Sequence, residues 1–282
     1  MSEPALRHPF TQVDVFTDRP LLGNPVAVVH DADRIDASAM QAFARWTNLS
    51  ETTFLLAAID PGADYRVRIF TPGGELAFAG HPTLGSCHAW LERGGVPRVA
   101  GEVVQECGVG LVRIRLEGRR AAFAAPPLRA QGVDGAVLDR VLAALGAPRS
   151  RLLAAQLLDN GPTWLGLLFD HAESVLALEP DHAALRILPK VGVIAPHAAG
   201  SECDFEARAF AASTGVPEDP VTGSLNASLA QWLIGVGLAP DRYVVAQGTR
   251  LGRAGRVYLE RQGNTFWVGG GSVTCIRGEV AW

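Results

Sequence analysis

Short stretches in which apolar and polar residues alternate, or in which apolar residues run together, recur along the whole chain. Both patterns are typical of β-strands, because successive side chains on a strand point to opposite faces. Residues that favour turns, chiefly Gly, Pro, Asn and Asp, separate the stretches. We therefore predict strands over residues 12–16, 26–29, 52–57, 65–70, 102–107, 111–116, 121–124, 152–158, 164–169, 190–195, 205–212, 243–246, 256–260, 265–269 and 273–276.

Helical spacing of apolar residues is confined to a few segments. It predicts helices over residues 36–47, 83–93, 135–145, 181–186 and 223–236. Two of them, 83–93 and 223–236, are long and apolar, and each half of the chain contains one. Many short strands around one such helix predict an α+β fold, with a mostly antiparallel sheet curled around a central helix in each half.

The segments before the two apolar helices resemble each other. Arg68-Ile69-Phe70 precedes the first helix and Arg208-Ala209-Phe210 precedes the second, about half the chain further on. We therefore predict two similar halves, residues 1–126 and 127–282, with a cleft between them. The Pro-rich stretch that starts at Pro126 is the predicted crossover.

The turn Gly80-His81-Pro82 is the most informative chemical feature. We expect the helix to begin directly after it, near Thr83, because Pro suits the first helical position. Backbone N–H groups at a helix start bind anions, so His81 is expected beside an anion site. In the second half Asp219 takes the place of the histidine, before the helix start at Gly223-Ser224. Gly80, Thr83, Gly223 and Ser224 are thus the predicted substrate contacts.

The composition of the chain limits the classes of function that it can have. The chain has 282 residues, of which 48% are hydrophobic and 19% charged, and its net charge is −4. This balance is ordinary for a globular enzyme, and without a basic excess it argues against nucleic-acid binding. The sequence shows no long apolar stretch and no apolar core near Met1 typical of a signal peptide, so we expect a cytoplasmic protein without membrane contact.

Five motifs, in order along the chain, can be compared with those of known families: Val13–Thr17 through Gly23–Val29, Asn48–Phe54, Phe70–Pro72 with the Gly-His-Pro turn, Asp219–Ser224, and Gln247-Gly248 with Gly252-Arg253 and Val268–Gly270. With them the chain resembles, over nearly its whole length, the PhzF family of phenazine-biosynthesis isomerases and their relatives. That family shares its fold with diaminopimelate epimerase. The resemblance implies a cofactor-independent isomerase and a homodimer.

The resemblance also implies roles for three residues. Glu51 matches the family's general acid/base, and a half-buried carboxyl group can take and return a proton. His81 and Asp219 match its other polar catalytic residues. Without the resemblance, Glu51 reads as a solvated loop carboxylate, His81 as a structural histidine and Asp219 as a helix N-cap. Asn24 reads as a turn residue.

The positions of the cysteines and of the possible metal ligands argue against two-cysteine catalysis and against a metal site. Diaminopimelate epimerase and related racemases use two cysteines before the two helices, whereas this chain has Ala79 and Asp219 there. The four cysteines, at positions 87, 107, 203 and 275, have no metal-type spacing and are expected to be small core residues. His88 and Glu92 share a helix face with His81, but no compact ligand set surrounds them, so we expect no metal.

We therefore expect an isomerase that moves a proton on a small anionic, carboxylated substrate. Two other functions remain open from the sequence: an amino-acid epimerase or racemase that works without thiols, and a binding protein that catalyses nothing. Arg68 and Arg208 are expected as strand residues, although either can clamp a carboxylate with two hydrogen bonds.

Overall fold

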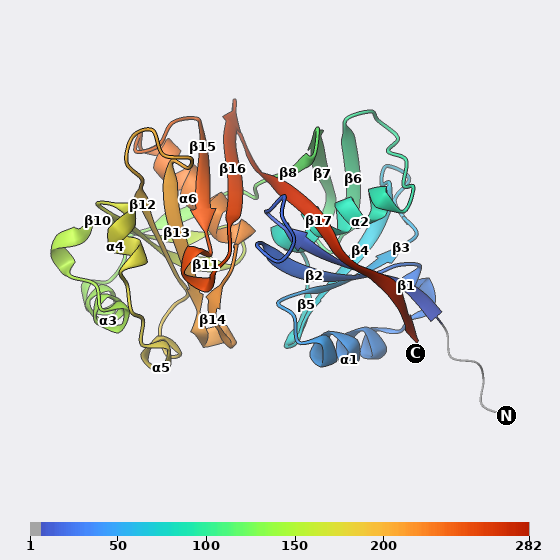
Figure 1. Cartoon of the computed structure of the whole chain (residues 1–282), viewed down its shortest axis with the longest axis horizontal. Coiled ribbons are helices and arrows are strands. Elements are labelled where there is room, and N and C mark those ends of the chain that lie inside the picture. Colours follow the sequence, from blue (N-terminus) through green and yellow to red (C-terminus); the bar gives the residue numbers. More distant parts are fainter. Residues whose placement is uncertain (1–6, 282) are drawn as a thin grey trace. The chain divides into compact units, whose positions relative to one another are not determined.

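The computed structural model describes residues 7–281, which form two compact units (Figure 1). Unit 1 contains the residues up to Ala124 and those from Gly269 onward, and unit 2 contains Ala125–Val268. The division at 126/127 that we predicted therefore assigns the C-terminal segment to the wrong unit. That segment belongs to β17 (Thr265–Ala281), which pairs antiparallel with β1 (Arg7–Val15).

Unit 1 is a ring of strands around one helix. Its remaining elements are β2 (Asn24–Val29), α1 (Ala37–Thr47), β3 (Thr52–Leu56), β4 (Tyr65–Thr71), β5 (Gly74–Leu76), α2 (Gly80–Glu92), β6 (Glu102–Cys107), β7 (Gly110–Glu117) and β8 (Arg120–Ala124). The pairings run β1–β2–β3–β4–β6–β7–β8–β17 and return to β1, so the sheet closes. The β2–β3 and β4–β6 pairs are parallel. The antiparallel pairs are β1–β2, β3–β4, β6–β7, β7–β8 and β1–β17.

Unit 2 repeats the same pairing pattern. Its elements are β9 (Arg129–Gln131), α3 (Gly135–Leu145), β10 (Leu152–Asp159), β11 (Thr163–Phe169), α4 (Ala172–Leu176), α5 (His182–Leu185), β12 (Val191–Pro196), β13 (Phe205–Ala211), β14 (Val216–Asp219), α6 (Gly223–Gly235), β15 (Arg242–Gln247) and β16 (Gly255–Gln262). As in unit 1, the second and third strands of the repeat, β11 and β12, are parallel. The strand before the core helix, β13, likewise pairs in parallel with the strand after it, β15.

The predicted fold class is thus confirmed, and so is the duplication. The short strands β5 and β14, absent from the prediction, form equivalent hairpins with β4 and β13. We predicted that the run Gly269-Gly270-Gly271 separates two strands, 265–269 and 273–276. Instead, the run lies inside the single strand β17. A Cβ on Gly271 would approach the carbonyl oxygen of Thr17 to 2.9 Å, so glycine permits close packing there.

The core helices α2 and α6 are apolar on most sides because strands surround them. Leu84 and Cys87 of α2 and Leu225 and Leu229 of α6 are fully buried. Glycine sets how closely α2 approaches the sheet: a Cβ on Gly85 would lie 2.4 Å from Val26 Cγ1.

Replacing Gly85 by alanine is expected to destabilise unit 1 by about 1–3 kcal/mol, because the added methyl overpacks the contact with Val26. The matched control is Gly235→Ala at the end of α6, where no atom lies within 4 Å of the added Cβ. There alanine is expected to stabilise by up to about 1 kcal/mol through helix propensity. Urea unfolding measures the change in the free energy of unfolding for both variants, and we expect the two changes to have opposite signs. Equal changes would contradict the packing argument.

Candidate functional site

Glu51 and His81 form a hydrogen-bonded pair in unit 1. His81 Nδ1 lies 2.8 Å from Glu51 Oε2, and His81 Nε2 lies 2.8 Å from the backbone carbonyl oxygen of Asn24. The His81 side chain is 5% exposed and that of Glu51 18%. The contact joins two elements, because Glu51 directly precedes β3 whereas His81 is the second residue of α2.

The Asn24 carbonyl determines where the imidazole protons lie. A carbonyl oxygen only accepts, so Nε2 of His81 carries a hydrogen, and Nδ1 faces Glu51. The Nδ1···Oε2 contact then holds one proton, either on a neutral Glu51 beside neutral His81 or on an imidazolium beside a carboxylate. Among residues 7–281, Glu51 Oε2 is the carboxylate oxygen that bonds to His81, and Oε1 makes no hydrogen bond.

Local sequence explains how the three groups meet. The α1 helix starts at the N-cap Asp36, whose carboxylate accepts from Ser38 N and Ala39 N, and ends at Asn48 in the left-handed conformation. That end directs the chain into Glu51 and β3. In the turn before β2, a Cβ on Gly23 would clash with Val15 O at 2.2 Å, so only glycine brings Asn24 into place.

The start of α2 differs from the prediction. The helix begins at Gly80, with Ala79 as N-cap, so Pro82 occupies its third position and not its first. Thr83 is fully buried: its N–H and its hydroxyl both donate to Ala79 O, and the hydroxyl accepts from Gln105. The prediction of Thr83 as a substrate contact is therefore wrong. The N–H groups of Gly80 and His81 precede the first intrahelical bond, which Thr83 N donates to Ala79 O. Gly80 must be glycine, because a Cβ would enter the Phe123 ring.

In unit 2, Asp219 is the last residue of β14 and is not the helix N-cap, which is Thr222. The Thr222 hydroxyl donates to Asp219 Oδ2 at 2.6 Å. The α6 helix starts at Gly223, as predicted. Counted from the first helical residue, the equivalent of His81 is Ser224, so the prediction that Asp219 takes the histidine's place is corrected.

Ser224 is held from two sides. Trp164 Nε1 donates to Ser224 Oγ at 3.2 Å, and Asn160 Nδ2 donates to Ser224 O at 3.0 Å. Because the Oγ already accepts from the indole, its own hydrogen is directed to another acceptor. The sequence pattern showed neither Trp164 nor the role of the Asn24 carbonyl, since a buried tryptophan and a turn residue look structural.

Arg68 and Arg208 bind protein carboxylates across the equivalent hairpins. Arg68 donates to both oxygens of Glu75 at 2.7 and 2.6 Å, and Arg208 donates to both oxygens of Glu218 at 2.9 Å. Arg208 Nη1 also donates to the carbonyl oxygens of Val175 and Leu178. In both arginines the Nε and Nη2 donors are therefore bonded to a protein carboxylate, and in Arg208 Nη1 is bonded within the protein as well.

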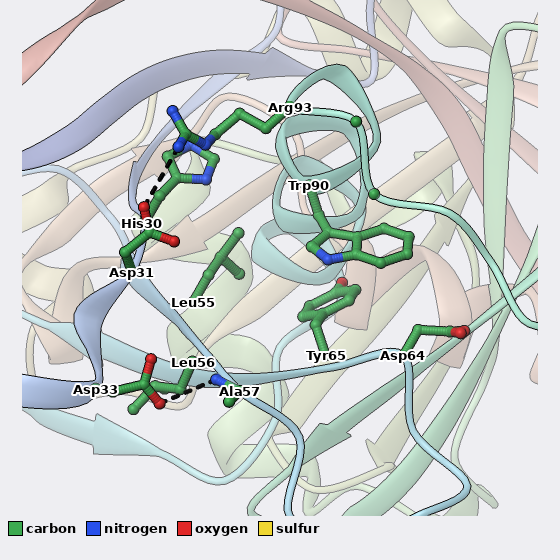
Figure 2. Close-up of a pocket in the computed structure, with 12 residues that line it drawn as sticks. His30, Asp31, Asp33, Leu55, Leu56, Ala57, Asp64, Tyr65, Trp90 and Arg93 are labelled. Atoms are coloured by element: carbon green, nitrogen blue, oxygen red, sulfur yellow. Dashed lines mark hydrogen bonds and ion pairs between the residues drawn. The ribbon is translucent and has the colours of Figure 1, made fainter.

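A pocket of about 380 Å³ lies elsewhere in unit 1, at the C-terminal end of α2 (Figure 2). Trp90 and Arg93 line it, and the Trp90 ring stacks on Tyr65 at 5.3 Å. Burial and the nearby Arg93 lower the pKa of His30 there to about 4, so its imidazole is neutral. None of the predicted site residues lines this pocket, and it is separate from the Glu51–His81 pair.

The remaining candidates have structural partners. His88 Nε2 lies 3.1 Å from Thr274 Oγ1 and 3.5 Å from Glu92 Oε1. Cys87 and Cys203 are buried, as expected of core residues, whereas Cys107 and Cys275 are only half-buried, so the prediction of four core cysteines is wrong for these two. Burial raises the pKa of Cys87 to about 12, which keeps it a neutral thiol. Within residues 7–281, no helix is both long and apolar enough to span a membrane.

Comparison with known proteins agrees with this fold. The family model described as "Phenazine biosynthesis-like protein" matches residues 13–278. "Antisense-enhancing sequence 1" of Schizosaccharomyces pombe is 37% identical, with 96% of this chain and 98% of that protein covered. A trans-2,3-dihydro-3-hydroxyanthranilate isomerase of Pseudomonas aeruginosa is 34% identical over 91% of each chain. The crystal structure of a Bacillus anthracis PhzF-family protein superposes with a TM-score of 0.86 at 23% identity, covering 98% of this chain and 99% of that one.

A duplicated sheet curled around a helix, with polar residues gathered at each helix start, defines the diaminopimelate epimerase-like fold class. The chain is an isomerase of that class. Within it, the chain belongs to the phenazine biosynthesis-like (PhzF) family.

Proposed function

We propose that this protein isomerises a small unsaturated carboxylate by general acid/base catalysis without a cofactor, with Glu51 as the group that moves the proton. The observation that carries the proposal is the Glu51–His81 hydrogen bond, with the imidazole oriented by Asn24 O. One carboxyl group that both accepts and donates a proton is what a proton shift requires.

The proposed step balances within the substrate and this pair. Glu51 gives a proton to one end of an allylic or dienyl system and accepts the proton released from its other end. The double bond moves and the net composition is unchanged. The imidazolium of His81 compensates the charge on the ionised Glu51, because its Nδ1–H donates to Oε2 while Oε1 releases and accepts the substrate proton.

Two features support an anionic substrate. Helix N-termini carry about half a positive charge, and α2 and α6 each begin with glycine followed by a polar residue. We propose that the start of α2 at Gly80 and the start of α6 at Gly223 and Ser224 are positions that bind anionic substrate groups, and that Asp219 supplies a further polar group in unit 2. Relatives named trans-2,3-dihydro-3-hydroxyanthranilate isomerase act on a cyclic unsaturated carboxylate, and we propose a substrate of that chemical class.

Incubation with trans-2,3-dihydro-3-hydroxyanthranilate in D₂O is expected to give an isomerised product that carries deuterium at the new C–H position. Mass spectrometry and NMR measure the label, and a chelator is expected to leave the rate unchanged because the proposed step uses no metal. Deuteration at Cα of amino acids, without a shift of a double bond in the carboxylate substrate, would favour the epimerase function. If neither reaction occurs across a panel of cyclic unsaturated carboxylates and amino acids, the proposal is wrong and a binding protein is favoured.

A further inference from the structure

Gln247, at the end of β15, is fully buried, and its side-chain amide is bonded to residues that lead into α6 or lie in its first turn. Its Oε1 accepts from Thr222 N at 3.1 Å and from Asn226 Nδ2 at 2.8 Å. Its Nε2 donates to Asp219 O at 3.1 Å and to Thr222 Oγ1 at 3.0 Å. A buried amide with all these bonds is costly to remove and constrains its neighbours strongly.

The orientation of this amide is determined by partners that have one role each. The backbone N–H of Thr222 only donates, so Oε1 faces it, and the carbonyl of Asp219 only accepts, so Nε2 faces that group. Since Nε2 also donates to Thr222 Oγ1, the hydroxyl hydrogen of Thr222 is directed to Asp219 Oδ2, 2.6 Å away. Gln247 therefore orients the hydroxyl that contacts the Asp219 carboxylate.

Unit 1 has a related arrangement, which shows that the feature belongs to the duplicated fold. The fully buried Gln105 of β6 donates through Nε2 to Thr83 Oγ1 at 3.0 Å and accepts from Tyr65 Oη at 2.9 Å. Thr83 and Asn226 are each the fourth residue of a core helix. Only in unit 2 does the network continue to a candidate catalytic side chain.

We propose that Gln247 and Thr222 are positioning residues for Asp219. They hold its carboxylate in one orientation at the start of α6 through the hydrogen bond that the Thr222 hydroxyl donates. This inference rests on the proposed function, since it gives Asp219 its task, but the geometry it predicts can be tested without activity.

The key variant is Thr222→Val, which keeps the side chain's shape and removes the hydroxyl. Its kcat is expected to fall about 10- to 100-fold with little change in KM, the factor for losing one hydrogen bond to a charged group. Thr222→Ser is expected to restore most of kcat. Thr214→Val is the matched control, because the Thr214 hydroxyl donates only to Ala211 O in the same unit.

A double-mutant cycle separates positioning from a general structural effect. In an Asp219→Asn background, Thr222→Val is expected to cause no further loss of kcat, because its effect passes through the carboxylate. Gln247→Glu, which replaces the Nε2 donor by an acceptor, is expected to behave like Thr222→Val. A full additional loss in the Asp219→Asn background would overturn the inference.

Crystal structures of Thr222→Val and Gln247→Glu provide the readout that does not need activity. The Asp219 carboxylate is expected to leave its wild-type position in both. If it stays in place in both variants, the inference is wrong even for an active enzyme. Wild-type turnover by Asp219→Asn, in contrast, would refute the catalytic role of Asp219 while the displaced carboxylate still supported the positioning network.

Discussion

Replacing Glu51 by glutamine is expected to lower kcat by about 10²–10⁴-fold, the usual contribution of one general acid/base. Glutamine keeps the size of the side chain, and its amide can donate to Nδ1 of a neutral His81, so the fold should remain intact. What it lacks is a titratable proton. The measurement is initial rate of isomerisation, together with deuterium incorporation from D₂O.

Glu75→Gln is the control for this experiment. It makes the same chemical change in the same unit, at a carboxylate that binds Arg68 and is 43% exposed. Its kcat is expected to equal that of the wild type. Unchanged turnover by Glu51→Gln would mean that another group moves the proton.

Replacing Arg208 by leucine is expected to destabilise unit 2 by about 3–5 kcal/mol, because it leaves the carboxylate of Glu218 buried without its partner. The side chains of Arg208 and Glu218 are only 4% and 7% exposed. The carbonyl oxygens of Val175 and Leu178 lose a donor as well. Chemical denaturation measures the loss in the free energy of unfolding, and hydrogen exchange in β13 measures the loss of protection within unit 2.

The duplicated fold offers an internal control for this loss. Arg68 makes the same two hydrogen bonds to Glu75 in the equivalent hairpin, but there the two side chains are 29% and 43% exposed. Arg68→Leu is therefore expected to cost about 0–1 kcal/mol, as exposed ion pairs do. Equal losses in the two variants would show that burial does not decide the energetics of these pairs.

Much of the fold was predictable, because the periodicity of a buried helix and of short strands is local. The repeated Arg-x-Phe tripeptide correctly indicated two similar halves, and in each the arginine binds the glutamate of the following hairpin. Strands β5 and β14 were missed because they are short and carry polar residues or proline. The start of α2 was misplaced by three residues, because Pro82 was assigned to the first helical position when the third also lacks an intrahelical partner.

The site was predictable only in part. Glu51 and His81 were identified by resemblance to a family, but their hydrogen bond joins residues far apart in the chain. The Asn24 carbonyl acts through the backbone, so its residue type carries no signal. Thr83 was expected to contact the substrate because it was placed at the helix start, yet it is fully buried. Which unit a strand joins is a tertiary property, and this is why the last strand was assigned to the wrong half.

That last strand has a consequence for biosynthesis. Residues 125–268 are continuous, so unit 2 can fold as soon as it leaves the ribosome, whereas the ring of unit 1 stays open until β17 has been synthesised. Arg7 of β1 is paired with Ala281 of β17, so the two ends of the described chain are neighbours. Joining those ends and reopening the chain between Ala124 and Ala125 would give a circular permutant in which each unit is one uninterrupted segment.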